Sequence, residues 1–150
     1  MNAIDRFTGL APVFLSLLRF FTGTMFACHG AQKVLGAFGG LPPGAEGWML
    51  DVAGPLELGG GILIAVGLLT RPVAFLCSGL MAVAYWYGHG MQSFWPKANG
   101  GEPAVLYCFI FLYLAAAGPG AWAVDNLFRR AQIGDRTDRQ IGPIGAPSPL

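Results

Sequence analysis

Apolar residues dominate the chain in four long runs, and each run is long enough to form a membrane-spanning helix. A spanning helix needs roughly 20 mostly apolar residues. The pattern predicts helices over residues 12–35, 52–70, 72–94 and 102–118. Pro72 opens the third run, where proline suits a first helical turn, and Gly118-Pro119-Gly120 stops the fourth. The hydrophobic pattern therefore predicts an all-α, integral membrane four-helix bundle.

The segments outside these runs are short or polar. Residues 121–131 form an amphipathic stretch in which Trp122 can lie at the headgroup level while Arg129 faces water. From residue 132 onward the chain has Pro, Gly and charges but little to bury, so we expect a disordered tail over 132–150. One membrane domain over 12–131 thus follows an N-terminal segment, 1–11.

Basic residues near the helix ends predict the orientation. Arg6, Arg71, Arg129 and Arg130 fall on one side of the four crossings, whereas Lys33 and Lys97 fall on the other. Cytoplasmic ends of membrane helices carry the excess of Lys and Arg. Both termini are therefore expected in the cytoplasm, with the loops 36–50 and 95–101 facing outward.

Composition excludes two large classes of protein. Hydrophobic residues make up 54% of the 150 residues and charged residues 11%, whereas soluble domains carry roughly 25% charged residues. The net charge is +1 with no basic stripe, which argues against a nucleic-acid partner. Three cysteines lie in apolar runs without metal-like spacing. We expect all three to be small core residues, with a disulfide or redox pair between Cys28 and Cys108 as the alternative.

Polar and ionisable residues in or next to the apolar runs are the candidate site, because a charge near the bilayer centre costs at least about 2.5–3.5 kcal/mol. Helix geometry at 1.5 Å per residue sorts them by depth into two layers. The outer layer contains His29, Gln32, Lys33, Glu57, His89, Asn99 and Glu102. The inner layer contains Arg19 and Asp125, the nearest acid that could reach it.

Helix faces indicate which of these side chains point inward. In the second run Gly54, Glu57, Gly61 and Ala65 share one face, a small-residue stripe that favours close helix packing. In the fourth run the shared polar and aromatic face, expected to point inward, contains Glu102, Phe109 and Tyr113. These faces predict that several helices bring polar groups to one layer.

Structural explanations compete with functional ones at each position. Lys33 and Glu57 can form an ion pair that only fixes the packing, and Arg19 can reach the cytoplasmic surface as a structural residue. His29 and His89 at matched depth could ligate a haem or a metal, which is disfavoured because no ligand motif accompanies them. The aromatic cluster Tyr85-Trp86-Tyr87 forms an interfacial belt or the wall of a pocket.

Several motifs together resemble the DoxX family over roughly Phe14 to Leu127. They are Arg19-Phe20-Phe21-x-Gly23 with His29-Gly30-x-Gln32-Lys33, Gly54-x-x-Glu57-x-Gly59-Gly60-Gly61 with Gly67-Leu68-x-Thr70-Arg71, Asn99-Gly100-Gly101-Glu102, and Gly118-Pro119-Gly120-x-Trp122-x-x-Asp125. The resemblance implies a multi-pass protein of the bacterial or archaeal inner (plasma) membrane. It also implies a link to quinone-dependent or thiol-stress redox systems, in which several relatives take part.

Three functions remain open at this stage. The first is a component of a membrane redox system, in which the outer layer binds a quinone headgroup. The second is a non-catalytic anchor or scaffold subunit for a partner oxidoreductase, since the chain has no cofactor motif; activity in isolation is disfavoured. The third and least favoured is a small transporter, because no inverted repeat or broken helix is evident. The expected partners are the lipid bilayer and a redox enzyme.

Overall fold

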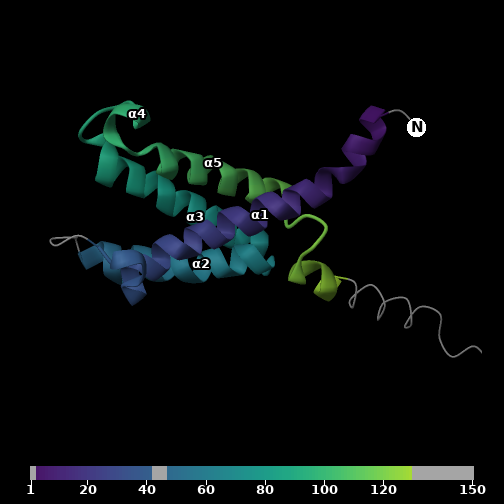
Figure 1. Cartoon of the computed structure of the whole chain (residues 1–150), viewed down its shortest axis with the longest axis horizontal. Coiled ribbons are helices and arrows are strands. Elements are labelled where there is room, and N and C mark those ends of the chain that lie inside the picture. Colours follow the sequence, from purple (N-terminus) through teal and green to yellow (C-terminus); the bar gives the residue numbers. More distant parts are fainter. Residues whose placement is uncertain (1–2, 42–46, 130–150) are drawn as a thin grey trace, which may run out of the picture.

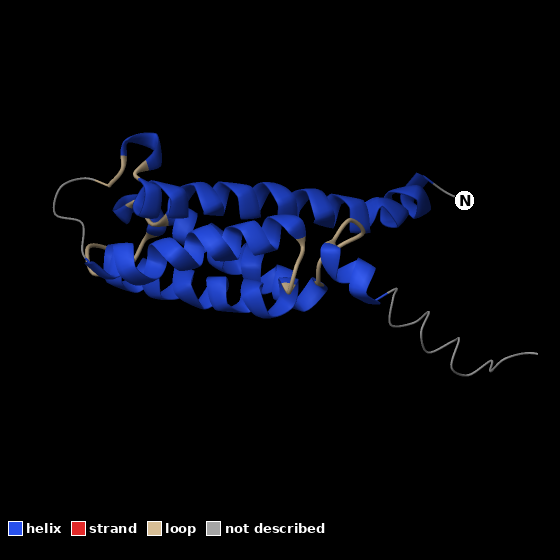
Figure 2. Cartoon of the chain, turned by 90° about the horizontal axis from the view of Figure 1, so that it is seen from below, coloured by secondary structure: helices blue, strands red, loops and turns tan. Residues whose placement is uncertain are grey.

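A computed structural model describes residues 3–41 and 47–129, with the side chains of 3–6 left out, and helix is the only regular secondary structure within them (Figure 2). The expected tail, 132–150, lies outside the described residues. The elements are α1 (Ala3–Leu35), the 3-10 turn η1 (Ala37–Gly39), the π-helix η2 (Met49–Ala53), α2 (Gly54–Val66), α3 (Thr70–Tyr85), the π-helix η3 (Trp86–Gly90), α4 (Pro96–Asn99) and α5 (Glu102–Ala117). A last helical segment covers 124–129.

Two helical pairs make up the molecule. Helix α1 packs on α2, and α3 packs on α5, with the α2–α3 turn joining the pairs (Figure 1). The N-terminal end of α1, the α2–α3 turn and the segment 124–129 lie at one end of the molecule, and α4 lies at the other (Figure 1). We call these the inner end and the outer end.

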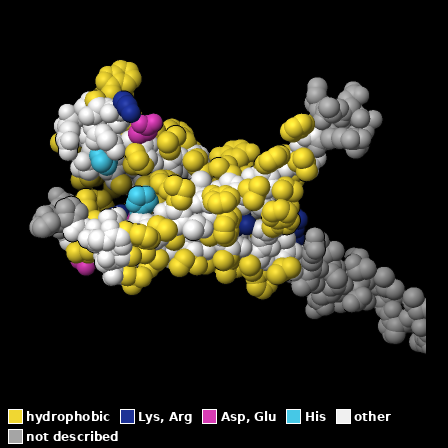
Figure 3. All heavy atoms as spheres, viewed as in Figure 1, with side chains coloured by type: hydrophobic (Ala, Val, Ile, Leu, Met, Phe, Trp, Pro, Cys, Tyr) yellow, Lys and Arg dark blue, Asp and Glu magenta, His cyan; other side chains and the backbone are white. Residues whose placement is uncertain are grey.

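The lengths and surfaces of the helices suit a bilayer. Phe7–Leu35 and Met49–Val66 are long and apolar enough to cross a membrane, each with a mean hydropathy of 1.5. In both segments only 28% of the residues of the most apolar stretch are buried, so their apolar side chains face outward instead of filling a soluble core. Phe75 and Leu76 on α3 are likewise 63% and 64% exposed. Apolar side chains cover most of the visible face (Figure 3).

Small residues bring α1 and α2 into backbone contact, as the stripe on the second run predicts. A Cβ added to Gly23 would lie 2.6 Å from the backbone nitrogen of Ala65, and one added to Gly61 would lie 2.5 Å from that of Ala27. Both separations are shorter than van der Waals contact. The stripe therefore faces α1, and this packing needs glycine.

The inward face of α5 differs from the one predicted. Tyr107, Phe111 and Leu114 are buried against α3 and Phe26, whereas Phe109 is 65% and Tyr113 57% exposed. The fourth run is apolar on all sides, so its sequence pattern does not define one face. Packing against α3 and α1 decides which residues turn inward.

Helix ends also differ from the predicted bounds. Helix α1 begins at Ala3, so it includes Pro12 and much of the segment expected to precede it. Helix α2 ends at Val66 because Gly67 takes a left-handed conformation (φ 74°) and its N–H closes on Leu63 and Ile64. Helix α3 therefore starts at Thr70, two residues before Pro72. Its regular part stops at Tyr85 instead of residue 94, and η3 follows.

Candidate functional site

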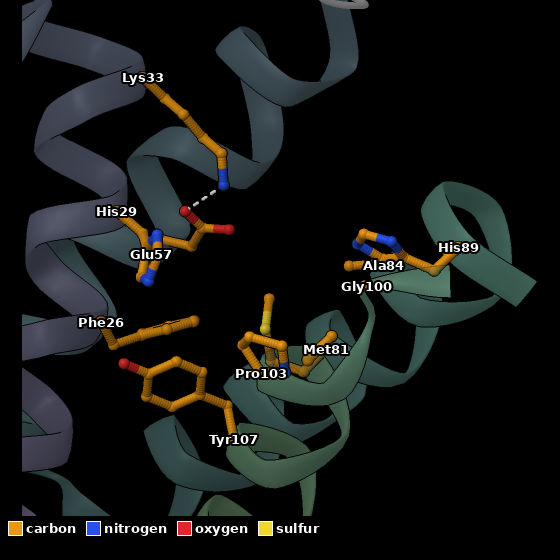
Figure 4. Close-up of a pocket in the computed structure, with 11 residues that line it drawn as sticks. Phe26, His29, Lys33, Glu57, Met81, Ala84, His89, Gly100, Pro103 and Tyr107 are labelled. Atoms are coloured by element: carbon orange, nitrogen blue, oxygen red, sulfur yellow. Dashed lines mark hydrogen bonds and ion pairs between the residues drawn. The ribbon is translucent and has the colours of Figure 1, made fainter. Parts of the chain in front are cut away.

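A cavity opens between the two helical pairs near the outer end. Its volume is about 240 Å³. Helices α1, α2, α3, α5 and the π-helix η3 all contribute to its wall (Figure 4). The lining residues are Phe26, His29, Lys33, Glu57, Met81, Ala84, His89, Gly100, Pro103, Ala104 and Tyr107. Figure 3 shows two histidine side chains on either side of this hollow. We call it the outer cavity.

Lys33 and Glu57 form an ion pair across the α1–α2 interface. Lys33 Nζ donates to Glu57 Oε2, and the side chains are 17% and 4% exposed. The second carboxylate oxygen of Glu57 points into the cavity (Figure 4). The predicted pair is thus present, and it leaves one acceptor oxygen directed at the cavity.

His89 enters the cavity from the opposite wall. Its Nδ1 lies 3.0 Å from the carbonyl oxygen of Asn99. A carbonyl can only accept, so Nδ1 carries the proton and donates. In the neutral ring Nε2 is then an acceptor, and in the protonated ring it becomes a donor. The loop therefore engages Nδ1 of the imidazole and leaves Nε2 to bond other partners.

Asn99 holds the loop that positions His89. Its amide nitrogen donates to the carbonyl of Ser93 at 2.7 Å and to the Tyr85 hydroxyl at 3.3 Å, and its Oδ1 accepts from the N–H of Gly101 at 2.8 Å. The Tyr85 hydroxyl in turn donates to the carbonyl of Phe94 at 2.6 Å. Asn99 is 9% exposed and lines the loop, not the cavity. Its role is to position its neighbours.

His29 and Tyr107 form the third side of the cavity. Their rings meet edge to face with centroids 6.0 Å apart. Tyr107 also stacks on Phe111 and contacts Phe26, with centroids 5.5 Å and 5.3 Å away. Within the described residues no hydrogen bond engages the Tyr107 hydroxyl. Sequence analysis did not select Tyr107, because a tyrosine in an evenly apolar helix gives no polar signal.

Besides Asn99, two predicted members of the outer layer lie outside the cavity. Gln32 donates from its side-chain nitrogen to the carbonyl of Gly40 at 2.9 Å, which fixes the chain after α1. Glu102 is exposed and lines a neighbouring groove. The cysteines are all free: Cys28 is exposed, and Cys108 Sγ lies 3.6 Å from Ser78 Oγ. The structure contains no Cys28–Cys108 disulfide.

The inner layer is built on backbone groups instead of an ion pair. Arg19 is 3% exposed and does not reach the surface of the protein. Its guanidinium donates to the carbonyls of Ile64, Ala65, Pro119 and Trp122. The Asp125 carboxylate accepts from the N–H groups of Leu69 and Thr70 and so caps α3. Within the described residues, the hydrogen bonds of Arg19 and Asp125 join separate segments of the backbone and so stabilise the fold.

The outer cavity combines groups suited to proton exchange. An ammonium–carboxylate pair, two imidazoles and a phenol surround a space with the volume of about eight water molecules. Such groups can hydrogen-bond opposite ends of one small polar ring and carry protons to it. Across the described residues, no three His, Cys, Asp or Glu side chains come together as a metal site.

Comparisons with known proteins agree with a membrane location. The DoxX family profile matches residues 14–90. A protein of Haemophilus influenzae is 43% identical over 136 residues, covering 85% of this chain and 98% of its own. Inner membrane protein YqjF of Escherichia coli is 31% identical, covering 72% and 79%. A membrane protein of Mycobacterium tuberculosis is 26% identical, covering 80% and 85%. No solved structure matches.

Proposed function

Because the chain belongs to the DoxX family of membrane proteins, we propose that it spans the bacterial or archaeal inner membrane four times and binds a membrane quinone in the outer cavity. The domain over 12–131 forms the membrane bundle, and both termini lie in the cytoplasm. The printed name of the Escherichia coli relative supports the inner membrane. Arg71 and Arg129, which line one cavity at the inner end, support the orientation.

One observation supports quinone binding above the others. Ionisable side chains from α1, α2 and η3 converge on a single small cavity near the outer membrane surface. Burying an ionisable group within a membrane costs free energy. Such a group in a membrane protein therefore indicates a functional site. The cavity volume of about 240 Å³ lies below the roughly 300–1,000 Å³ of sites for drug-sized ligands. A single quinone ring suits such a space.

The residues around the cavity have distinct roles in this proposal. Reduction of a quinone to its quinol takes up two electrons and two protons. A partner oxidoreductase supplies the electrons, and the outer cavity supplies the protons. Protonated His89 donates from Nε2 to one quinone oxygen, and the Tyr107 hydroxyl or His29 donates to the other. Glu57, held by Lys33, passes replacement protons from the outer surface.

Removal of one hydroxyl tests the site with little change in packing. We expect Tyr107→Phe to weaken binding of tailless dimethoxy-methyl-benzoquinone about tenfold, because a single hydrogen bond contributes about 1 kcal/mol or slightly more. Titration of the purified protein in nanodiscs measures the affinity. Tyr113→Phe on the same helix is the matched control, because Tyr113 is 57% exposed. Equal affinities for wild type, Tyr107→Phe and His89→Ala would contradict the proposal.

A scaffold role is the second candidate, and the ion pair is the observation that favours it. Lys33 and Glu57 satisfy one another inside the protein, so the outer layer can serve packing alone. In that case the chain anchors a redox enzyme and contributes no ligand site. Native mass spectrometry after mild extraction separates the two functions. A retained quinone supports the first, and a co-purified polypeptide without a small molecule supports the second.

A further inference from the structure

A second hollow runs along the outside of the molecule between α1 and α5. Its volume is about 450 Å³. It shares His29, Pro103 and Tyr107 with the outer cavity, so these three side chains form a common wall (Figure 4). The second hollow therefore adjoins the first, with these side chains between them. We call it the lateral groove.

The surface of the lateral groove is suited to hydrocarbon. Met25, from α1, and Leu106, from α5, line it and are 58% and 56% exposed, and Ile110 is a third apolar side chain in its wall. Thr22 also lies in the wall, but its hydroxyl donates to the carbonyl of Leu18 at 2.6 Å. That hydroxyl needs no partner from a ligand. Glu102 is the charged residue of the groove, and it lies at the outer end, where α5 begins.

The groove runs from the outer end of the molecule toward the middle of α5. From Glu102 to Ile110 it follows α5 for about 12 Å along the helix axis, and the apolar residues come after the polar end. A molecule with a polar ring in the outer cavity and an apolar chain in the groove would match both surfaces. A water-soluble ligand would match only the first.

Given the proposed function, on which this step rests, we propose that the lateral groove holds the isoprenoid tail of the quinone. The headgroup passes sideways from the bilayer between α1 and α5, and His29 and Tyr107 form the doorway. A different apolar cleft, between α3 and α5 under Trp86 and Phe94, shares only Met81 with the outer cavity. Where this cleft meets the outer cavity it has no ionisable side chain, so it is the weaker candidate for the path of the headgroup.

Photolabelling locates the tail directly. The probe is a benzoquinone headgroup with a diazirine on the first isoprene unit, added to the full-length protein in nanodiscs. We expect labelled peptides to map to residues 22–29 and 102–110. An excess of ubiquinone with a two-unit tail should suppress the label. Label on residues 81–96 would overturn the proposal, as would label that the competitor leaves unchanged.

A bulky residue in the groove provides an independent test. Leu106→Trp should weaken binding of the two-unit ubiquinone about tenfold, and leave the affinity for the tailless headgroup unchanged. Phe109→Trp is the matched control, because Phe109 is 65% exposed and lines the other cleft. An effect of Phe109→Trp without an effect of Leu106→Trp would assign the tail to that cleft and overturn the lateral groove.

Binding of the tailless headgroup distinguishes a failure of the headgroup site from a failure of the tail site. If it binds the wild type and the label maps elsewhere, the groove is wrong and the headgroup site stands. If it does not bind, the headgroup site fails and the groove fails with it. Both outcomes are read from the same preparation.

Discussion

Single side chains at the outer cavity show how the chain places charge inside a membrane. Glu57 is 3% exposed one turn into α2, and the cation that balances it comes from α1. Breaking a buried pair leaves an uncompensated charge, which costs about 3–5 kcal/mol, whereas replacing both partners with apolar residues is often neutral. The charge on α1 and the charge on α2 are therefore stable inside the protein only when both helices are packed together.

Removal of Lys33 alone should therefore harm the protein more than removal of both partners. We expect Lys33→Met to lower the free energy of unfolding by about 3–5 kcal/mol, and the double variant Lys33→Met with Glu57→Leu to recover most of that loss. Unfolding of the purified protein in mild detergent measures both. Losses that simply add would show that the two residues act independently.

At the residue scale, sequence reasoning found charges more readily than neutral groups. His29, Lys33, Glu57 and His89 were predicted in one layer, and all four line the outer cavity. Tyr107 lies in the same wall but was not predicted, because an aromatic residue in an apolar helix has no distinctive pattern. Asn99 and Gln32 were predicted in the layer from their polarity, although both hold loops. Polarity in a sequence does not distinguish a ligand contact from a loop contact.

At the scale of elements, glycine controls how closely α1 and α2 approach. Without Gly61, the backbone of Ala27 could not lie where it does. Membrane helices gain little from burying apolar area, because lipid tails are equally apolar. Close packing therefore drives the association of α1 with α2. The glycines on the α1–α2 contact are therefore structural, and the ion pair depends on the distance they set.

A pair of alanine substitutions on α2 tests this packing. Gly61→Ala should destabilise the protein by about 1–3 kcal/mol, because the added methyl group meets the backbone of α1. Gly59→Ala is the control, since nothing lies within 4 Å of its added Cβ, and we expect an unchanged or slightly raised stability. Thermal unfolding of the two variants measures the contrast. Equal effects would mean that α1 and α2 do not need contact this close.

The π-helix η3 is the element that the hydrophobic pattern could not predict. The apolar run continues to residue 94, yet regular α-helix stops at Tyr85. The Tyr85 hydroxyl bonds the carbonyl of Phe94, and His89 bonds that of Asn99. These contacts join residues on opposite sides of a bend, so they depend on tertiary structure. The change in helical pitch places His89 beside the cavity.

For the whole molecule, the all-helical membrane fold followed from hydropathy and composition, and the number of crossings stays a prediction. We expect green fluorescent protein fused after Leu150 to fluoresce, and alkaline phosphatase fused there to be inactive, because the basic residues predict that both termini lie in the cytoplasm. Alkaline phosphatase inserted after Lys97 should be active, since that loop is placed outside. Activity of the phosphatase at the C-terminus would reverse the orientation or change the number of crossings.

The hydrogen bonds of Arg19 depend on the order in which the chain is synthesised. Its guanidinium is satisfied in part by the carbonyls of Pro119 and Trp122, and Pro119 is synthesised 100 residues later. Until that segment has been synthesised, the first helix carries a cation that lacks two of its four acceptors. A chain truncated before Pro119 would retain this incompletely bonded charge. The hydrogen bonding of Arg19 is thus completed only after the segment that contains Pro119 and Trp122 has been synthesised.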